Sequence, residues 1–277
     1  MGLSMGVDDS STIERIDAFC DAVPRRWARA EEHGPLVMFV PTGPGFPYYA
    51  RPRRGTTERV TPDDIRAVRA RQRELLIPES FEWIDEAAPT MTAAAPDGGL
   101  AARAHPLMML GTLAPAPATE PDITVRLVSP GDPDLDRIWA VPAVAFGHPG
   151  TAVGLAGTID RDKIAADHDE SALDMLRDRL QSGQSVLAVA FGPQGPLAAG
   201  SCQPLGSVAE ITGVGVLPSA RRMGLGGAVT AALAGEALRR GVQTVFLAAS
   251  DDDVARVYAR LGFRRIGTAM IAEPDGA

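Results

Sequence analysis

The stretch from Val214 to Ala228 reads VGVLPSARRMGLGGA. An alternating apolar run ends at Val216, a short turn with Pro218 follows, and a helix is predicted to begin near Gly226. Glycines at a helix entrance let main-chain N–H groups approach a ligand, and the positive end of the helix favours an anion. The stretch therefore predicts a strand, a turn and a helix that bind a phosphate-bearing ligand.

Within this stretch, Arg221, Gly224 and Gly226 form an Arg-x-x-Gly-x-Gly pattern, and Arg222 adds a second positive charge. A dinucleotide-binding Gly-x-Gly-x-x-Gly would follow its strand directly, whereas several residues intervene here. The Gly-Lys-Ser/Thr of a nucleoside triphosphate loop is absent. A glycine-rich helix entrance that binds no ligand stays an alternative on the residues alone.

The surrounding pattern predicts antiparallel strands followed by alternating helices and strands. This order indicates a mixed α/β (α+β) sheet. The expected elements are strands Ser185–Phe191, Leu197–Gln203 and Val208–Val216, a helix from about Gly226 to Arg240, strand Thr244–Ala249, helix Asp253–Leu261 and strand Arg264–Ala272.

Two blocks of this half resemble a known family. The segment from Ala209 through Arg-Arg-Met-Gly-Leu-Gly resembles the acetyl-CoA-binding motif of the GNAT superfamily of N-acetyltransferases. The block VARVYARLGF, which ends at Phe263, is similar to that family's Tyr-x-x-Leu-Gly-Phe helix end. The resemblance covers roughly Ile123 to Ala272. It implies a GNAT-like fold and an acetyl-CoA-dependent N-acetyltransferase.

The resemblance also implies how acetyl-CoA, the co-substrate, would bind. The main chain of one strand end would pair with the pantetheine arm, and the glycine loop would hold the pyrophosphate. The implied cofactor-binding residues are Val214, Gly215, Val216, Arg221, Arg222, Met223, Gly224, Leu225, Gly226, Gly227 and, as a weaker polar contact, Ser250. The family often has Asn near Asp251, and this chain departs from that pattern.

Acyl transfer from a thioester to an amine calls for an acid and a base. Tyr258 can protonate the departing thiolate, and the alternative is a core tyrosine that packs beneath Leu261 and Phe263. Glu210 is the candidate base, and strict alternation would place it on the face of Val214. The alternative for Glu210 is an ion pair with a neighbouring arginine.

The oxyanion donor implied by the resemblance is a main-chain N–H near Val216. Neither Cys20 nor Cys202 stands out as a nucleophile, and Cys202 is expected to be a small buried hydrophobe. Direct attack by the amine in a ternary complex is therefore expected. The four histidines have no metal-ligand spacing, so no metal is predicted.

The front half is predicted to be a degenerate acetyltransferase-like or substrate-covering domain over residues 1–113. A linker, APAPATEP, follows at 114–121, and the catalytic domain covers 122–277. Aligning Gly99-Leu100 with Gly262-Phe263 matches strand, helix and strand without a gap, which predicts a tandem of one degenerate and one complete domain. Coincidence is the alternative. Trp83 and Glu86 are candidates to line an amine site, and core packing and a surface carboxylate are the alternatives.

Two helices are predicted in the front half. A Ser-x-x-Glu capping box at Ser11 indicates a helix to about Glu32, and Thr61 followed by Pro62 indicates a second helix to Ile77.

A net charge of −8 argues against nucleic acid as a partner. No apolar run approaches a membrane span, and Met1–Gly6 carries no leader pattern, so a cytoplasmic protein is expected. The acceptor is expected to be a small-molecule or peptide amine, although His148–His168 shows no readable specificity. The expected state is a monomer or homodimer. A non-catalytic acyl-CoA-binding or regulatory module is the alternative function.

Overall fold

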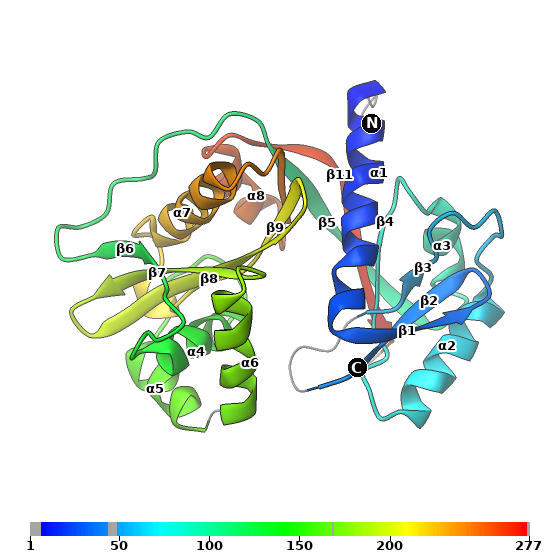
Figure 1. The fold of residues 1–277 in the computed structure, drawn as a ribbon, viewed down its shortest axis with the longest axis horizontal. Helices are drawn as coiled ribbons and strands as arrows, with labels where there is room; N and C mark the ends of the chain where they lie inside the picture. Colours follow the sequence, from blue (N-terminus) through cyan, green and yellow to red (C-terminus); the bar gives the residue numbers. More distant parts are fainter. Residues whose placement is uncertain (1–6, 44–48, 168, 276–277) are drawn as a thin grey trace. The chain divides into compact units, whose positions relative to one another are not determined.

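The computed structural model describes residues 7–43, 49–167 and 169–275 (Figure 1). The segment Met1–Gly6, which bears on the leader prediction, and His168 lie outside them. The chain divides into two compact units. Unit 1 is drawn from Met1–Leu107, Ala248–Ser250 and Arg265–Ala277, and unit 2 from Met108–Leu247 and Asp251–Arg264.

The first part of the chain supplies most of unit 1. Its elements are α1 (Val7–Ala22), the 3-10 helix η1 (Pro24–Arg26), β1 (Ala28–His33), β2 (Leu36–Pro41), β3 (Arg51–Pro52), α2 (Pro62–Glu74), β4 (Phe81–Ile84), α3 (Pro89–Ala94) and β5 (Leu100–Leu110). Strands β1, β2 and β3 form one antiparallel sheet in that order.

The second part of the chain supplies most of unit 2. Its elements are β6 (Thr124–Leu127), α4 (Leu135–Phe146), α5 (Thr158–Ala166), α6 (Glu170–Gln181), β7 (Val186–Gly192), β8 (Gly195–Leu205), β9 (Val208–Val216), η2 (Pro218–Ala220), α7 (Leu225–Arg239), β10 (Thr244–Ala248), α8 (Asp252–Ala259) and β11 (Phe263–Pro274). Strands β6 to β9 pair as antiparallel neighbours, and β10 joins β9 in parallel. The predicted mixed α/β sheet is confirmed.

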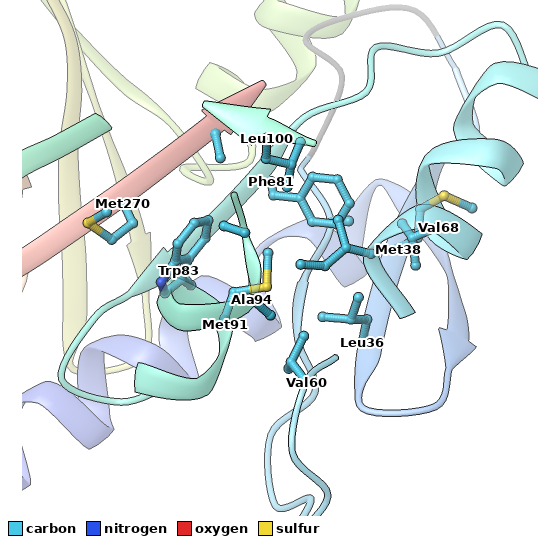
Figure 2. Packing of buried hydrophobic residues seen from close by; sticks show 14 residues of the cluster. Leu36, Met38, Val60, Val68, Phe81, Trp83, Met91, Ala94, Leu100 and Met270 are labelled. Atoms are coloured by element: carbon cyan, nitrogen blue, oxygen red, sulfur yellow. The ribbon is translucent and has the colours of Figure 1, made fainter. Parts of the chain in front are cut away.

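The core of unit 1 draws on both ends of the chain. Phe81 and Trp83 of β4 pack with apolar side chains from β2, α2 and α3 (Figure 2). Met270 and Ala272 of β11 belong to the same cluster. Strand β11 also pairs with β4 in antiparallel register, with Met270 opposite Trp83. Unit 1 is therefore completed by residues far along the chain.

Helices cover both faces of the unit 2 sheet (Figure 1). A Cβ on Gly200 of β8 would contact Val229 and Leu233 of α7. A Cβ on Gly215 of β9 would lie 2.9 Å from Pro142 Cα of α4. Helix α7 therefore packs on one face, and α4 packs on the other.

Helix α2 agrees with its predicted start. Thr61 is the N-cap, its hydroxyl accepts the Asp64 N–H, and the Asp64 carboxylate accepts the Thr61 N–H. The helix ends at Glu74, before Ile77, because Leu76 has a left-handed backbone with φ of 55°.

The predicted first helix is wrong at both ends. The helix is already formed at Val7, and it stops at Ala22 instead of continuing to Glu32. Pro24 has no N–H to continue the hydrogen bonding of α1, and the chain turns there into η1. The residues after it form β1, which pairs with β2.

The contacts of Trp83 and Glu86 agree with the alternative to an amine site, which is core packing and a surface carboxylate. Trp83 is 1% exposed, and its indole N–H donates to Thr92 Oγ1 at 2.8 Å. The Glu86 carboxylate accepts the Thr268 N–H at 2.9 Å, so it ties down β11. Both residues hold unit 1 together.

The proposed internal repeat has a structural counterpart. Under the predicted alignment, β4 falls on β10, α3 on α8 and the start of β5 on the start of β11. Gly99 and Gly262 both have positive φ, 77° and 96°. Ala95, at the place of Tyr258, is buried. The pattern is present in both windows, and an acetyltransferase-like origin of the first stays a prediction.

The compact units do not follow the predicted domain limits. The segment 114–121 lies inside unit 2, where Pro117 Cγ is 3.0 Å from a Cβ placed on Gly227. The Ala114 N–H donates to the Leu261 carbonyl at 3.0 Å. These contacts hold the expected linker against unit 2, although none of its residues is buried. Among the described residues, no helix is long and apolar enough to cross a membrane.

Candidate active site

Strand β9 carries a β-bulge just before its end. Ser201 of β8 pairs with Thr212, whereas Ala199 pairs with Gly215, so Gly213 and Val214 oppose the single residue between them. Gly213 has φ of 65°, a conformation that glycine adopts at little cost. The bulge shifts the alternation of β9 by one residue.

This shift corrects the predicted face of Glu210. Val214 Cγ2 lies 2.9 Å from a Cβ placed on Gly200, and Val216 Cγ2 lies 3.3 Å from one placed on Gly226, so both valines face α7. Ile211 is opposite Cys202, which is on the face of Gly200. Glu210 therefore points to the α4 side, and the expectation that it shares a face with Val214 is wrong.

Strand β9 stops pairing with β10 at Glu210. Over the described residues, their parallel pairing covers Thr244 to Phe246 of β10 and ends at the pair Phe246 and Glu210. Strand β9 nevertheless continues to Val216. The edge from Ile211 to Val216 is thus available to an extended ligand, which can pair with strand main chain as an added strand does.

The entrance of α7 follows this open edge. Arg222 and Gly224 have φ of 71° and 76°, and Gly224 is the N-cap with no side-chain capping bond. The first turn of α7 contains no acidic residue. Arg222 and Met223 are exposed, while Leu225 is buried and anchors the turn. An uncapped helix start with a positive side chain beside it suits an anion.

The first arginine of the motif has a different role. The Arg221 guanidinium donates to the main-chain carbonyls of Ala145, His148 and Ala152. Both terminal nitrogens of Arg221 are thus directed to main-chain oxygens. Its side chain was predicted to add charge to the ligand site, and the structure directs it to the α4–α5 connection.

Tyr258 lies on α8, next to the entrance of α7. Its neighbour Val257 has Cγ1 4.0 Å from a Cβ placed on Gly227. Tyr258 is 8% exposed, and its ring centroid lies 6.1 Å from that of Phe263. Burial raises the pKa of Tyr258 to about 12, so the phenol stays protonated at neutral pH. Both readings of Tyr258, proton donor and core packing, agree with these contacts.

Glu210 is half-buried at the point where β9 and β10 separate. Its charge contributes to the raised pKa of Cys202, about 12, of which burial is the larger cause. Cys202 is 1% exposed, which confirms the expectation that it is a small buried side chain.

Ser250 belongs to unit 1, where His105 Nδ1 lies 3.1 Å from its carbonyl oxygen. It stays a predicted cofactor contact. The described residues contain no group of three or more His, Cys, Asp or Glu side chains that could hold a metal ion.

Two features of the site were missed in the sequence. A glycine inside a predicted strand often marks a bulge, and Gly213 carried that signal. Helix α5, capped at Gly157 by the Asp160 carboxylate, lies in the stretch that showed no specificity. Its Gly-x-x-Asp start was the available signal.

Comparisons with known proteins agree with this geometry. Residues 192–271 match the family model "FR47-like protein". A search of curated proteins finds no match.

Solved structures share the fold over most of the chain. The GCN5-related N-acetyltransferase from Kribbella flavida is 21% identical, with a TM-score of 0.69, and the match covers 99% of this chain and 98% of that one. A GNAT-family acetyltransferase structure from Novosphingobium aromaticivorans is 18% identical, with a TM-score of 0.51 and coverage of 90% and 92%.

A tandem GNAT protein from the clavulanic acid biosynthesis pathway is 15% identical, with a TM-score of 0.51 and coverage of 87% and 79%. The bulged strand, the open strand edge and the glycine-rich helix start lie within or beside the matched residues. The chain therefore has the fold of the GCN5-related N-acetyltransferases, with an FR47-like domain over residues 192–271.

Proposed function

We propose that this protein transfers an acetyl group from acetyl-CoA to a primary amine, by direct attack in a ternary complex. The observation that carries the proposal is the separation of β9 from β10 beyond Glu210, directly upstream of the uncapped start of α7. The unpaired edge of β9 suits an extended chain with amide groups, and the start of α7 suits a pyrophosphate. Acetyl-CoA contains both in that order.

The residues present fit this co-substrate. The main chain of Val214 to Val216 would pair with the pantetheine arm, and the N–H groups from Arg222 to Gly227 would hold the pyrophosphate. The thioester supplies the activated acetyl group. A main-chain N–H near Val216 would stabilise the negative charge that develops on the carbonyl oxygen.

The chain's own acid and base complete the reaction. Tyr258 holds its proton at neutral pH and would deliver it to the departing thiolate. Glu210, where the strands separate, would accept a proton from the amine, through water or directly, or bind the cationic amine. Direct attack by the amine needs no cysteine nucleophile, and Cys202 is buried.

Thermal unfolding with and without acetyl-CoA tests the proposal. Saturation at a hundred times the dissociation constant should raise the free energy of unfolding by about 2.7 kcal/mol. Arg222→Glu should abolish the shift, because it places a negative charge beside the pyrophosphate. Arg59→Glu, at an exposed position in the loop before α2, is the matched control. No shift at millimolar acetyl-CoA would contradict the proposal.

A non-catalytic acyl-CoA-binding module is the second candidate. The packing of Tyr258 against Phe263 favours it, since a core tyrosine needs no chemical role. The two candidates differ in turnover: both bind acetyl-CoA, and only the enzyme releases CoA when amines are supplied.

A further inference from the structure

The Arg221 side chain joins three points of the α4–α5 connection. Nη1 donates to the Ala152 carbonyl at 3.1 Å, and Nη2 donates to the Ala145 carbonyl at 3.2 Å and to the His148 carbonyl. The planar guanidinium suits several acceptors at once, and bonds from a charged donor are stronger than neutral ones. A residue at the turn between β9 and α7 thus fixes a segment about seventy positions earlier.

The same connection is bonded to the turn at two further places. The Gly154 N–H donates to the Pro218 carbonyl at 3.1 Å, and the Ser219 N–H donates to the Ala156 carbonyl at 3.0 Å. Gly157 lies against Ser219, where a Cβ would be 2.7 Å from Oγ. We name residues 147–157 the α4–α5 loop. It rests on the turn that links the open edge of β9 to the start of α7.

The α4–α5 loop and its flanks carry exposed apolar side chains. Phe146 is 62% exposed, Val153 is 61% exposed and Leu155 is fully exposed. Removing apolar side chains from water lowers the free energy of the protein. The exposure of these three side chains next to the proposed ligand-binding turn is therefore costly unless a ligand or a chain segment covers them.

We propose that Arg221 is a positioning residue that couples the α4–α5 loop to the cofactor-binding turn, so that the ligand at α7 and the order of the loop influence each other. The inference rests on the proposed function, in which this turn holds the pyrophosphate. Pyrophosphate binding fixes Arg222 to Gly227 and, through the Arg221 main chain, holds its guanidinium against the three carbonyls. Coupling of this kind is reciprocal: an ordered loop strengthens ligand binding by the same factor.

Hydrogen exchange of the full-length protein tests the coupling, with CoA as the probe. In the wild type, saturating CoA should slow exchange of the amides in 147–157 by about fivefold or more. In Arg221→Gln, the loop should exchange faster without ligand, and CoA should no longer slow it. Arg221→Lys retains the charge with fewer donors and should restore part of the coupling.

A control variant and a binding measurement separate this role of Arg221 from a general loss of stability. Arg59→Gln, at an exposed position in the loop before α2, should behave as the wild type throughout. If CoA binding in Arg221→Gln weakens while the loop exchanges as in the wild type, Arg221 is a phosphate ligand and the proposal is overturned. Wild-type loop exchange that ignores bound CoA also overturns it.

The failure of the proposed function gives a different result. If CoA does not bind the wild type at any concentration, thermal unfolding shows no shift and the coupling falls with the proposed function. The role of the Arg221 side chain in holding the α4–α5 loop is then tested by comparing the wild type with Arg221→Gln, both without ligand. Faster exchange of the loop amides in Arg221→Gln supports this role of Arg221, and unchanged exchange overturns it.

Discussion

At the residue scale, Tyr258 of α8 is the proposed proton donor, and its side chain is 8% exposed. Burial favours its neutral form, which is the form a proton donor needs. Its contact with Phe263 fixes the ring, so replacement by phenylalanine keeps the packing and removes only the hydroxyl.

We expect Tyr258→Phe to lower the rate of acetyl transfer by about 10²-fold or more, since general acid catalysis contributes about that much. The dissociation constant for acetyl-CoA should change little, because the variant leaves the main-chain donors in place. Release of CoA thiol measures the first quantity, and titration calorimetry measures the second. An unchanged rate would remove Tyr258 from the mechanism.

The pH dependence of the free energy of unfolding tests the burial of Tyr258 independently of catalysis. The pKa of Tyr258 is about 12 in the folded protein, above its ordinary value of 10. The unfolded chain therefore loses this proton first, and the stability that Tyr258 contributes falls as the pH rises from 10 towards 12. Tyr258→Phe should lack this loss in denaturant unfolding across that range.

At the element scale, α7 uses its glycines in two ways. Gly224 begins the helix with φ of 76°, where a side chain is strained. Gly235 is inside the helix, and a Cβ there would meet only Leu113 Cδ2 at 3.9 Å, an ordinary contact. Substitution of the two glycines should therefore change stability in opposite directions.

We expect Gly224→Ala to lower the free energy of unfolding by about 1 to 2 kcal/mol, the cost of the left-handed conformation. Gly235→Ala should raise it by about 0.5 to 1 kcal/mol, because alanine is the better helix former. Denaturant unfolding measures both. Gly224→Ala should also weaken acetyl-CoA binding, whereas an equal effect of both variants would argue against the geometry of the helix start.

Elements with strong local signals were predictable. The cap of α2 at Thr61 and the strand, turn and helix around Gly224 follow from short-range chemistry. The bulge at Gly213 was not predicted, because alternation alone assumes a regular strand. The side chain of Arg221 was assigned to the ligand because its acceptors lie on α4 and the following loop, far away in the sequence. Tertiary contacts decided both cases.

At the scale of the whole molecule, the two units share the chain unevenly. Unit 1 takes Ala269 to Ala272 of β11 as the antiparallel partner of β4, although β11 begins in unit 2. Strand β5 also contributes residues to both units. A division of the chain at the expected linker therefore cuts through elements that each unit needs.

We expect the fragment 122–277, expressed alone, to be insoluble or to lack a cooperative unfolding transition. It would expose Met270 of β11 and leave that strand without β4, and unpaired strand edges promote aggregation. Co-expression with residues 1–121 should restore soluble protein. Circular dichroism and size-exclusion chromatography give the readout, and a folded, monomeric fragment would contradict the expectation.

The passage of β11 into unit 1 also sets the order of events during synthesis. Domains usually fold as they emerge from the ribosome, the N-terminal one first. Here the core around Phe81 and Trp83 lacks Met270 and Ala272 until every residue of unit 2 has been translated. The part of the protein that is made first is thus completed last, and the nascent chain must keep a partly built core from aggregating while the rest is added.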